Sequence, residues 1–303
     1  MTGLDASALV AGAFTFRFAP YQPLVMGIVN TNPGSFSDST APGGFDDLLA
    51  RALAVVDAGA DIVDIGFDSG VTYNAPIPAS EQIAGGVPLV AELARRGVPV
   101  SLDTPNPDVA RAGLDAGAVL LNDVSGLAEP ALAELAAEFG AALCVLHTRA
   151  PHKVEHFPDY AALPSGDVVQ DVVDFIGEQI DRAAELGVPA ERIVVDPGFD
   201  YAKRPHETVA VIQAIDRLDA FARPYLFGVS RKYFAGIVTG AAPADRLPET
   251  LATIAYLRRH PGFVRVHDVA IVRRFLDITE ILDGATPFPP YDQLDDDLKW
   301  VRP

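Results

Sequence analysis

The chain has 303 residues, of which 49% are hydrophobic and 21% charged, and this suits one large α/β domain better than two small ones. A net charge of −18 argues against general nucleic-acid binding, because that binding depends on neutralising phosphates. No apolar run approaches the roughly 20 residues of a membrane helix, and a single cysteine, Cys144, excludes an internal disulfide framework. Because Asp5 stands where a signal peptide would carry basic residues, we expect a cytoplasmic protein with no membrane or nucleic-acid partner.

Eight short apolar runs, rich in Val, Ile and Leu, follow one another along the chain, as is typical of strands buried on both faces. The runs are residues 24–30, 61–66, 98–104, 118–123, 143–147, 192–198, 225–232 and 263–268. Amphipathic patterns that predict helices lie between most of them, for example at 45–59, 107–117, 168–187 and 247–260. A glycine that can end a helix in the left-handed conformation then precedes the next strand, at Gly59, Gly97, Gly117, Gly140 and Gly187.

The repeated helix–glycine–strand unit predicts a right-handed series of parallel strands. Eight such units in about 260 residues fit a closed (β/α)8 barrel, the TIM barrel, as a single domain. We expect the barrel at 24–283, an N-terminal extension at 1–23 and a C-terminal tail at 284–303. An open doubly wound sheet is the alternative, but no glycine-rich nucleotide-binding segment follows a strand, which weakens it.

Polar side chains stand near the C-terminal ends of the eight runs, where a barrel enzyme builds its active site. They are Asn30, Asp64, Asp103, Asn122, His147, Asp196, Lys232, Arg265 and His267. The last three are cations, and the loops after strands seven and eight of such barrels often form a phosphate site. Arg265 and His267 are two residues apart, so they share one face of an extended strand. These cations predict an anion site; the alternative is a structural salt bridge, for example with Asp268.

Asp103, Asn122 and Asp196 end three different strands and together offer acceptors and donors to a flat heterocycle with amino and lactam N–H groups. The alternative is that each of them caps the following helix or turn. Asn30 follows the first strand directly, and its amide oxygen is a candidate ligand for Mg²⁺ if a diphosphate supplies further oxygens. An Asx turn at the start of the next loop would explain Asn30 equally well.

Seven segments of the chain, in this order, resemble the dihydropteroate synthase family. They are VMGIVNTNPGSFSDS (25–39), DAGADIVDIG (57–66), VSLDT (100–104), AGAVLLNDVSGL (116–127), VDPGFDYAK (195–203), GVSRKYFAG (228–236) and RVHDV (265–269). The resemblance implies a TIM barrel, usually a homodimer. It also implies a step of folate biosynthesis, in which 6-hydroxymethyl-7,8-dihydropterin diphosphate condenses with p-aminobenzoate and diphosphate is released.

The resemblance also implies roles for individual residues. The diphosphate and Mg²⁺ would be held by Asn30, Arg265 and His267, and the pterin would be bound by Asp103, Asn122, Asp196 and Lys232. Of these, Asn30, Lys232, Arg265 and His267 would be the catalytic residues. The aminobenzoate side would be built by Phe36, Ser37 and Asp38 of the first loop and by Tyr233.

The acceptor side departs from the family pattern. The second loop reads GFDSGVTYN (66–74) where the family typically has GGESTRPG, so Gly70 and Val71 replace a threonine and an arginine. Tyr233 stands where the family usually has a serine near the aminobenzoate carboxylate, and Asp200 replaces a glycine. Two functions therefore stay open. One is a dihydropteroate synthase with a remodelled acceptor pocket, and the other is a diverged homologue that uses another amine acceptor or lacks synthase activity.

Overall fold

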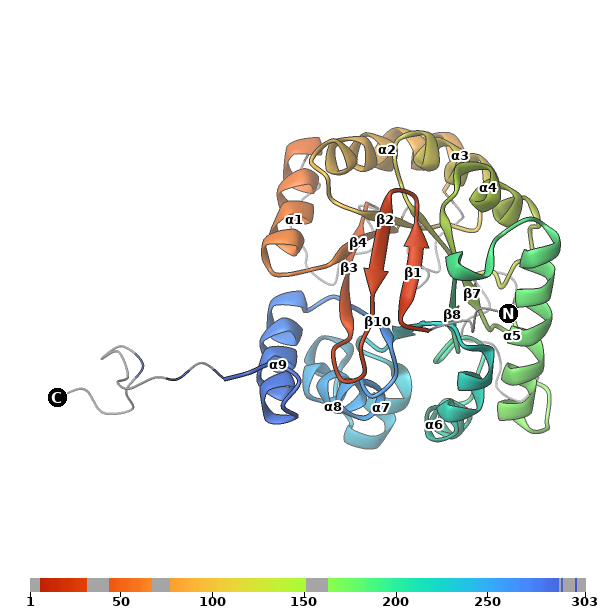
Figure 1. The fold of residues 1–303 in the computed structure, drawn as a ribbon. Coiled ribbons are helices and arrows are strands. Elements are labelled where there is room, and N and C mark those ends of the chain that lie inside the picture. The colour runs from red at the N-terminus through yellow and green to blue at the C-terminus, as the bar shows by residue number, and fades with distance from the viewer. Residues whose placement is uncertain are drawn as a thin grey trace.

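A computed structural model describes residues 6–31, 44–66, 77–150 and 163–288 of the chain, together with positions 290 and 298. Eight parallel strands form a closed barrel in the order β10-β3-β4-β5-β6-β7-β8-β9, and helices surround it (Figure 1). The TIM barrel that the repeated units predict is therefore confirmed, as a single domain. None of the helices in this part of the chain combines the length and the apolar character that a membrane crossing requires.

Strands and helices alternate along the barrel, as the sequence predicts. The barrel strands are β3 Leu24–Asn30, β4 Ile62–Gly66, β5 Val100–Asp103, β6 Leu120–Asp123, β7 Ala142–Leu146, β8 Ile193–Asp196, β9 Tyr225–Gly228 and β10 Gly262–Val266, and β1 Ala8–Ala11 and β2 Phe14–Arg17 form a separate hairpin. The α-helices are α1 Phe45–Asp57, α2 Ala79–Arg95, α3 Pro107–Asp115, α4 Ala131–Phe139, α5 Val168–Glu185, α6 Pro205–Gln213, α7 Tyr233–Thr239, α8 Leu247–Leu257 and α9 Val269–Leu282. The five glycines between helix and strand all have positive φ, from 63° at Gly140 to 106° at Gly117, so this prediction is confirmed.

Five of the eight strands end before their apolar runs do, and the backbone explains this for β8 and β9. β8 ends at Asp196 because Pro197 has no N–H to continue the ladder, and Gly198 then turns the chain with a φ of 67°. β9 ends at Gly228, and the segment that follows it turns at Arg231, where φ is 57°. The sequence places Lys232 at the end of a strand, and this is wrong. Lys232 directly precedes helix α7.

Side chains inside the barrel form layers, because successive residues of a strand point to opposite faces. The layer near the beginning of the strands is apolar and includes Met26, Ile62, Leu120, Leu226 and Phe263. Two residues further along the same strands, the inward positions of three strands carry polar groups, namely Asp64, Asn122 and Arg265. The barrel interior thus changes from apolar to charged along its axis.

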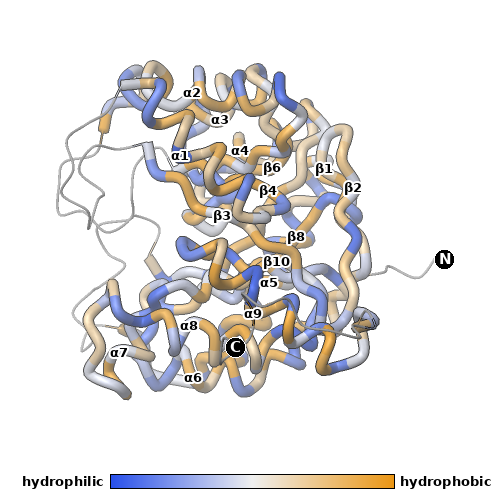
Figure 2. Tube along the Cα trace, turned by 90° about the vertical axis from the view of Figure 1, so that its left-hand side faces the viewer, coloured by the Kyte–Doolittle hydropathy of each residue, from blue (hydrophilic) through white to orange (hydrophobic). Residues whose placement is uncertain are grey.

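The N-terminal hairpin covers the end of the barrel where the strands begin (Figures 1 and 2). Leu9, Phe16 and Phe18 are buried against the apolar layer. The rings of Phe16 and Phe18 both pack edge-on against Phe263, with ring centroids 5.1 Å and 5.0 Å apart. The described part of the predicted N-terminal extension, residues 6–23, therefore closes this end of the barrel and completes its core.

We expect that Phe16→Ala lowers the free energy of unfolding by about 3 kcal/mol, because it removes a buried ring and leaves a cavity under the barrel. Urea unfolding followed by circular dichroism measures this loss. Thr15→Ala, at the exposed neighbouring position, is the matched control and should change stability by less than about 0.5 kcal/mol. Equal effects of the two substitutions would show that the hairpin does not contribute to the core.

Candidate active site

A pocket opens at the C-terminal ends of the barrel strands and combines apolar walls with a few polar groups, as ligand sites commonly do. Ile28, Val124 and Leu146 contribute apolar walls. The other lining residues are Asn122, Asp196, Tyr201, Gly228, Ser230, Lys232, Arg265 and His267. Five of these, Asn122, Asp196, Lys232, Arg265 and His267, are residues that the sequence predicts for the site.

Asn30 and Asp103 lie in the same row of paired residues as Asn122. Asn30 pairs with Gly66, Gly66 with Asp103, and Asp103 with Asn122 across neighbouring parallel strands. A Cβ atom at position 66 would lie 2.5 Å from Asn30 Oδ1 and 4.0 Å from Asp103 Oδ2. Gly66 therefore leaves the space that the Asn30 amide occupies, and the two polar side chains flank it.

Two carboxylates hold Arg265 inside the barrel. Its Nε donates to Asp64 Oδ2 over 2.6 Å, and its Nη2 donates to Asp103 Oδ2 over 2.7 Å. Asp64 is fully buried and also accepts hydrogen bonds from Ser101 Oγ at 2.5 Å and Asn122 Nδ2 at 3.4 Å. Burial opposes the charge of Arg265, but Asp64 and Asp103 outweigh this effect and raise the pKa of the guanidinium. The guanidinium is thus charged and largely neutralised by its own neighbours.

His267 lies at the mouth of the pocket beside Arg265. Its Nδ1 lies 2.8 Å from Ser230 Oγ. Desolvation, and secondly the nearby charge of Arg265, lowers the pKa of His267 to about 4. The side chain is nevertheless exposed to solvent, which screens both effects, so the sequence-based inclusion of His267 in an anion site stays a prediction.

Arg265 does form a structural salt bridge, the alternative that the sequence leaves open, but its partners are Asp64 and Asp103 and not Asp268. Asp268 Oδ1 instead binds Arg231 Nη2 at 3.0 Å, away from the interior of the barrel. Arg265 is thereby left to the carboxylates of the inner layer. The sequence could not separate these two pairings, because both involve a cation near the end of a strand.

Asp196 and Asn122 supply buried acceptor oxygens. Asp196 is 3% exposed, and its Oδ1 accepts a hydrogen bond from the Gly198 N–H at 2.7 Å. Burial raises the pKa of Asp196 to about 6, although that hydrogen bond and three neighbouring cations favour the carboxylate. Among the described residues, no group donates a hydrogen bond to the buried Asn122 Oδ1. A buried oxygen of this kind is completed by a ligand or a water that donates a hydrogen bond.

Lys232 stands beside the same space. Its Nζ donates to the Phe199 carbonyl oxygen at 2.7 Å and lies 5.0 Å from the centre of the Tyr201 ring. A Cβ atom at Gly228 would lie 3.7 Å from Asp196 Oδ2 and 3.9 Å from Lys232 Nζ. Because position 228 is glycine, a carboxylate and an ammonium group both face one small space, and a ligand there meets an acceptor and a donor together.

Asn30 offers an oxygen of the kind that would hold a magnesium ion at this mouth. Mg²⁺ is usually bound through one or two protein oxygens, with substrate phosphates and water as its other ligands. The Asn30 amide oxygen, at the end of β3, offers one oxygen of the required kind. A site of this type would be completed only when a phosphate-bearing ligand is present.

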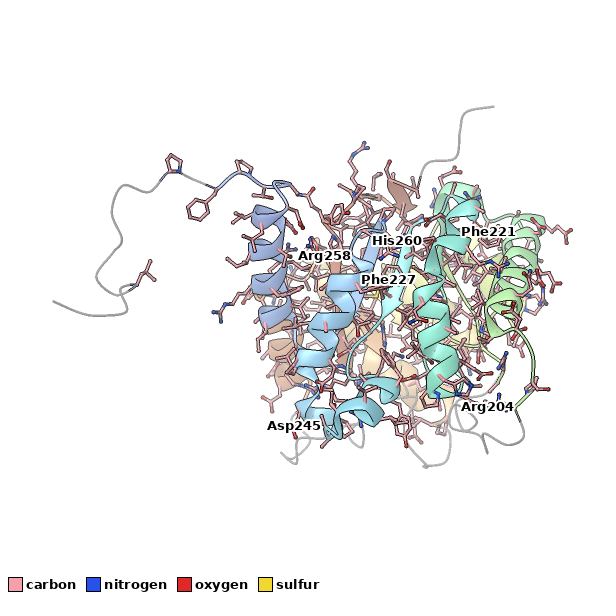
Figure 3. All side chains as sticks on the ribbon, turned by 90° about the horizontal axis from the view of Figure 1, so that it is seen from below. Arg204, Phe221, Phe227, Asp245, Arg258 and His260 are labelled. Atoms are coloured by element: carbon pink, nitrogen blue, oxygen red, sulfur yellow. The ribbon has the colours of Figure 1, made fainter. Side chains whose placement is uncertain are left out.

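A second group of possible metal ligands, Asp216, Asp219 and His260, lies toward the opposite end of the barrel. Figure 3 shows His260 far from Asp245, which lies at the mouth end. The two ring nitrogens of His260 lie 3.1 Å from Asp216 Oδ1 and 3.2 Å from Asp219 Oδ1. Arg259 Nη2 donates to the same Asp216 oxygen at 3.0 Å. Asp216 Oδ1 already accepts a hydrogen bond from Arg259, and Asp219 Oδ1 accepts one from the Tyr225 hydroxyl. Because the guanidinium of Arg259 also opposes a cation there, we assign no metal to this cluster.

The predicted acceptor side can be described only in part. Phe36, Ser37 and Asp38 lie outside the described residues, as do Gly70 and Val71.

Tyr233 lies at the start of α7 and is 42% exposed. Its backbone N–H donates to Asp200 Oδ2, and Asp200 Oδ1 accepts a hydrogen bond from Thr208 Oγ1 at 3.1 Å. The guanidinium of Arg246 lies 5.8 Å from the centre of the Tyr233 ring. A carboxylate is therefore held at the first N–H of α7, on the side where the sequence indicates the acceptor.

Four residues of the site receive no role from the sequence: Asp64, Ser101, Tyr201 and Ser230. Asp64 stands two positions before Gly66, so it points to the same face of β4, toward the barrel interior. A carboxylate in a strand buried on both faces needs a cation partner. That rule, applied to the alternation of the strand, could have paired Asp64 with Arg265. Tyr201 and Ser230 lie in turns, where no periodicity indicates direction.

A family model described as "Pterin binding enzyme" matches residues 26–267, which span the barrel. This match places the chain among pterin-binding enzymes built on a TIM barrel. A dihydropteroate synthase from Mycobacterium leprae is 38% identical over 262 residues, which cover 83% of this chain and 89% of that protein. The chain belongs to the dihydropteroate synthase family, whose members are transferases of folate biosynthesis.

Two further relatives agree with this membership. A probable bifunctional folylpolyglutamate synthase/dihydropteroate synthase from Haloferax volcanii is 39% identical over 247 residues, and this chain spans 81% of its own length but only 29% of that longer protein. The crystal structure of dihydropteroate synthase from Thermus thermophilus in complex with 4-aminobenzoate matches with a TM-score of 0.78 and 32% identity. That match covers 91% of this chain and 99% of the other.

We expect that Asp64→Ala lowers the free energy of unfolding by about 3–5 kcal/mol, because it removes a fully buried carboxylate and leaves the partly buried Arg265 with one carboxylate fewer. The double variant Asp64→Ala/Arg265→Ala should lose less than the sum of the two single losses, by about 0.5–3 kcal/mol. Urea unfolding of the three variants measures this coupling. Glu138→Ala, which breaks the exposed pair with Arg111, is the control and should change stability little. Strict additivity would mean that Asp64 and Arg265 do not stabilise each other.

Proposed function

We propose that the mouth pocket binds the pterin ring of 6-hydroxymethyl-7,8-dihydropterin diphosphate, and that the protein transfers this pterin to the amino group of p-aminobenzoate with release of diphosphate. The observation that carries the proposal is the convergence of Asn122, Asp196 and Lys232 on a pocket with apolar walls. A flat heterocycle suits such walls, and its polar edge suits the few polar groups between them.

The pterin edge and the pocket are complementary in hydrogen bonding. The 2-amino group and the adjacent ring N–H of a pterin are donors, and they match the Asp196 carboxylate and the Asn122 Oδ1. Lys232 Nζ is a donor for the oxygen and ring-nitrogen acceptors of the same heterocycle. Asp103 joins this subsite in the proposal, because it pairs in register with Asn122.

The diphosphate subsite in this proposal consists of Asn30, Arg265 and His267. In the reaction, the bond between the pterin methylene carbon and the diphosphate oxygen breaks, a carbon–nitrogen bond to the amine forms, and the amine loses one proton. Bound Mg²⁺, with Asn30 as its protein ligand, would offset the negative charge of the departing diphosphate. An aryl amine is already unprotonated near pH 7, so positioning and electrostatics suffice without a strong general base.

The acceptor is the part of the proposal with a real alternative. The Thermus relative solved with 4-aminobenzoate supports p-aminobenzoate. In this chain, however, the first N–H of α7 already donates to Asp200, whose negative charge opposes an acceptor that carries a carboxylate of its own. The alternative is a diverged homologue that transfers the pterin to another amine or lacks synthase activity.

The proposal is tested by incubating the purified protein with dihydropterin diphosphate, Mg²⁺ and an aryl amine, and following pyrophosphate and the pterin product together. Parallel reactions use p-aminobenzoate and its uncharged amide, 4-aminobenzamide. Stoichiometric pyrophosphate and dihydropteroate support the synthase, and a strong preference for the amide supports the alternative acceptor. Pyrophosphate without a pterin–amine product, or no turnover with either amine, contradicts the proposed transfer.

We expect pterin binding to weaken as the pH falls through about 6, because Asp196 must be in its carboxylate form to accept two donors, and burial raises its pKa to about 6. Below that pH the affinity should approach a tenfold loss for each pH unit. Titration of 6-hydroxymethylpterin fluorescence between pH 5 and pH 7.5 measures it. Asp196→Asn is the control and should bind weakly with no such dependence. Constant wild-type affinity over this range would remove Asp196 from the pterin subsite.

Homodimer assembly and a cytoplasmic location belong to the same proposal. The first rests on the family resemblance and the second on the sequence. Size-exclusion chromatography with light scattering measures the oligomeric state directly.

A further inference from the structure

The loop from Asp196 to α6 has an unfavourable backbone beside the pocket. Gly198, Asp200 and Ala202 all have left-handed backbone, with φ of 67°, 66° and 47°. This region is disfavoured for residues other than glycine. The same loop supplies Tyr201 to the pocket wall. A loop of this kind keeps one conformation only where other groups hold it in place.

Lys203 is the group that holds this loop from inside. It is 1% exposed, and its Nζ donates to the Gly198 carbonyl at 2.7 Å and to the His147 carbonyl at 3.3 Å. A Cβ atom at position 198 would lie only 1.9 Å from the His147 carbonyl oxygen, so the two segments are as close as glycine permits. The ammonium group thus joins the end of β7 to the turn that follows β8. Lysine is rarely buried to this degree unless its charge is paired with an opposite charge.

Asp196 is the charged neighbour that acts most strongly on Lys203. Arg149 and Lys232 oppose the ammonium charge, and Asp171 on α5 favours it. Burial lowers the pKa of Lys203 to about 7, so the side chain is charged at pH 6, where Asp196 titrates. In return, the ammonium group favours the carboxylate form of Asp196.

We propose that Lys203 is a positioning residue of the pterin subsite: its ammonium group fixes the turn after β8 and supplies positive charge that favours the Asp196 carboxylate. The inference rests on the proposed function, because it requires that Asp196 accepts hydrogen bonds from the pterin. Lys203 itself lies behind the Asp196 turn and is not among the residues that line the pocket.

The test compares Lys203→Met, Lys203→Gln and Lys203→Arg with the wild type. Methionine fills the buried space without donor or charge, glutamine keeps an N–H donor without charge, and arginine keeps the charge. The probe is 6-hydroxymethylpterin, and its dissociation constant is measured by fluorescence from pH 5 to pH 8. Circular dichroism and urea unfolding show which variants are folded.

We expect Lys203→Met and Lys203→Gln to move the midpoint of the binding profile upward by about one pH unit. Relative to the wild type, their affinity should therefore fall about fivefold further at pH 6 than at pH 8, and the difference should approach tenfold at pH 5. Lys203→Arg should retain the wild-type midpoint even if its affinity is lower. Arg204→Gln is the matched control, because Arg204 is the adjacent cation and also donates to carbonyl groups, those of Leu163 and Pro164. It should leave the midpoint unchanged.

A uniform loss of affinity at every pH, with the wild-type midpoint, would overturn the inference, because a purely structural lysine has that effect. A shift in Arg204→Gln equal to that in Lys203→Met would overturn it as well, since any nearby cation would then suffice. If Lys203→Met does not fold, Lys203→Gln against Lys203→Arg decides the same question.

The failure of the inference and that of the proposed function are separate results. If the wild type does not bind the pterin at any pH, the proposed function fails and the inference falls with it. If the wild type binds with a midpoint near pH 6 and the folded Lys203 variants share that midpoint, only the role of Lys203 is refuted.

Discussion

A guanidinium inside a barrel is tolerated only where carboxylates surround it, and Arg265 imposes this constraint on the whole site. Asp64 and Asp103 satisfy it from two neighbouring strands, β4 and β5, while Arg265 itself comes from β10. Since Asp64 also accepts from Asn122 Nδ2, the Asn122 amide is oriented with its oxygen away from Asp64. Asp64, the partner of Arg265, thus determines that Asn122 Oδ1 is the oxygen left to accept a hydrogen bond from a ligand.

The change of polarity along the barrel axis determines the electrostatics of the mouth. Apolar side chains fill the lower layer, and in the polar layer above it burial is the largest influence on the pKa of Asp196. Asp196 moves toward its neutral form as a result. The site therefore holds few uncompensated charges, and an arriving diphosphate would meet neutral donors as well as cations. Such a site suits a reaction in which charge develops on a leaving group, because its dipoles are already oriented.

Much of this arrangement could be predicted from the sequence, for a physical reason. Parallel strands buried on both faces appear as apolar runs, and their ends must meet at one rim, so Asn122, Asp196 and Arg265 are brought together by topology alone. The lowered pKa of His267 could not be predicted, because it depends on the surroundings that the fold builds around it, Arg265 among them. The place of Lys232 could not be predicted either, because Arg231 turns the chain with left-handed backbone that no apolar pattern signals.

Lys203 illustrates a further limit. In the sequence it is one of several lysines and arginines near loops, and only the approach of two carbonyl groups within a folded turn gives it a distinct environment. Asp64 is the opposite case, since strand alternation and the cost of burying an unpaired carboxylate could have indicated its partner, although the sequence analysis gives it no role. Contacts between neighbouring strands of the barrel can therefore be inferred from the sequence, whereas contacts between turns can be seen only in the folded structure.

The N-terminal hairpin has a consequence for the order of events at the other end of the barrel. With Phe16 and Phe18 packed against Phe263, the described residues close the end of the barrel where the strands begin, so a ligand would reach the pocket from the other end. Asn122 belongs to the polar layer directly above the closed end, so in the proposed reaction a pterin bound to it would lie deeper than the amine. The deeper ligand would then have to enter before the amine covers it, and the joined product would have to leave by the same end.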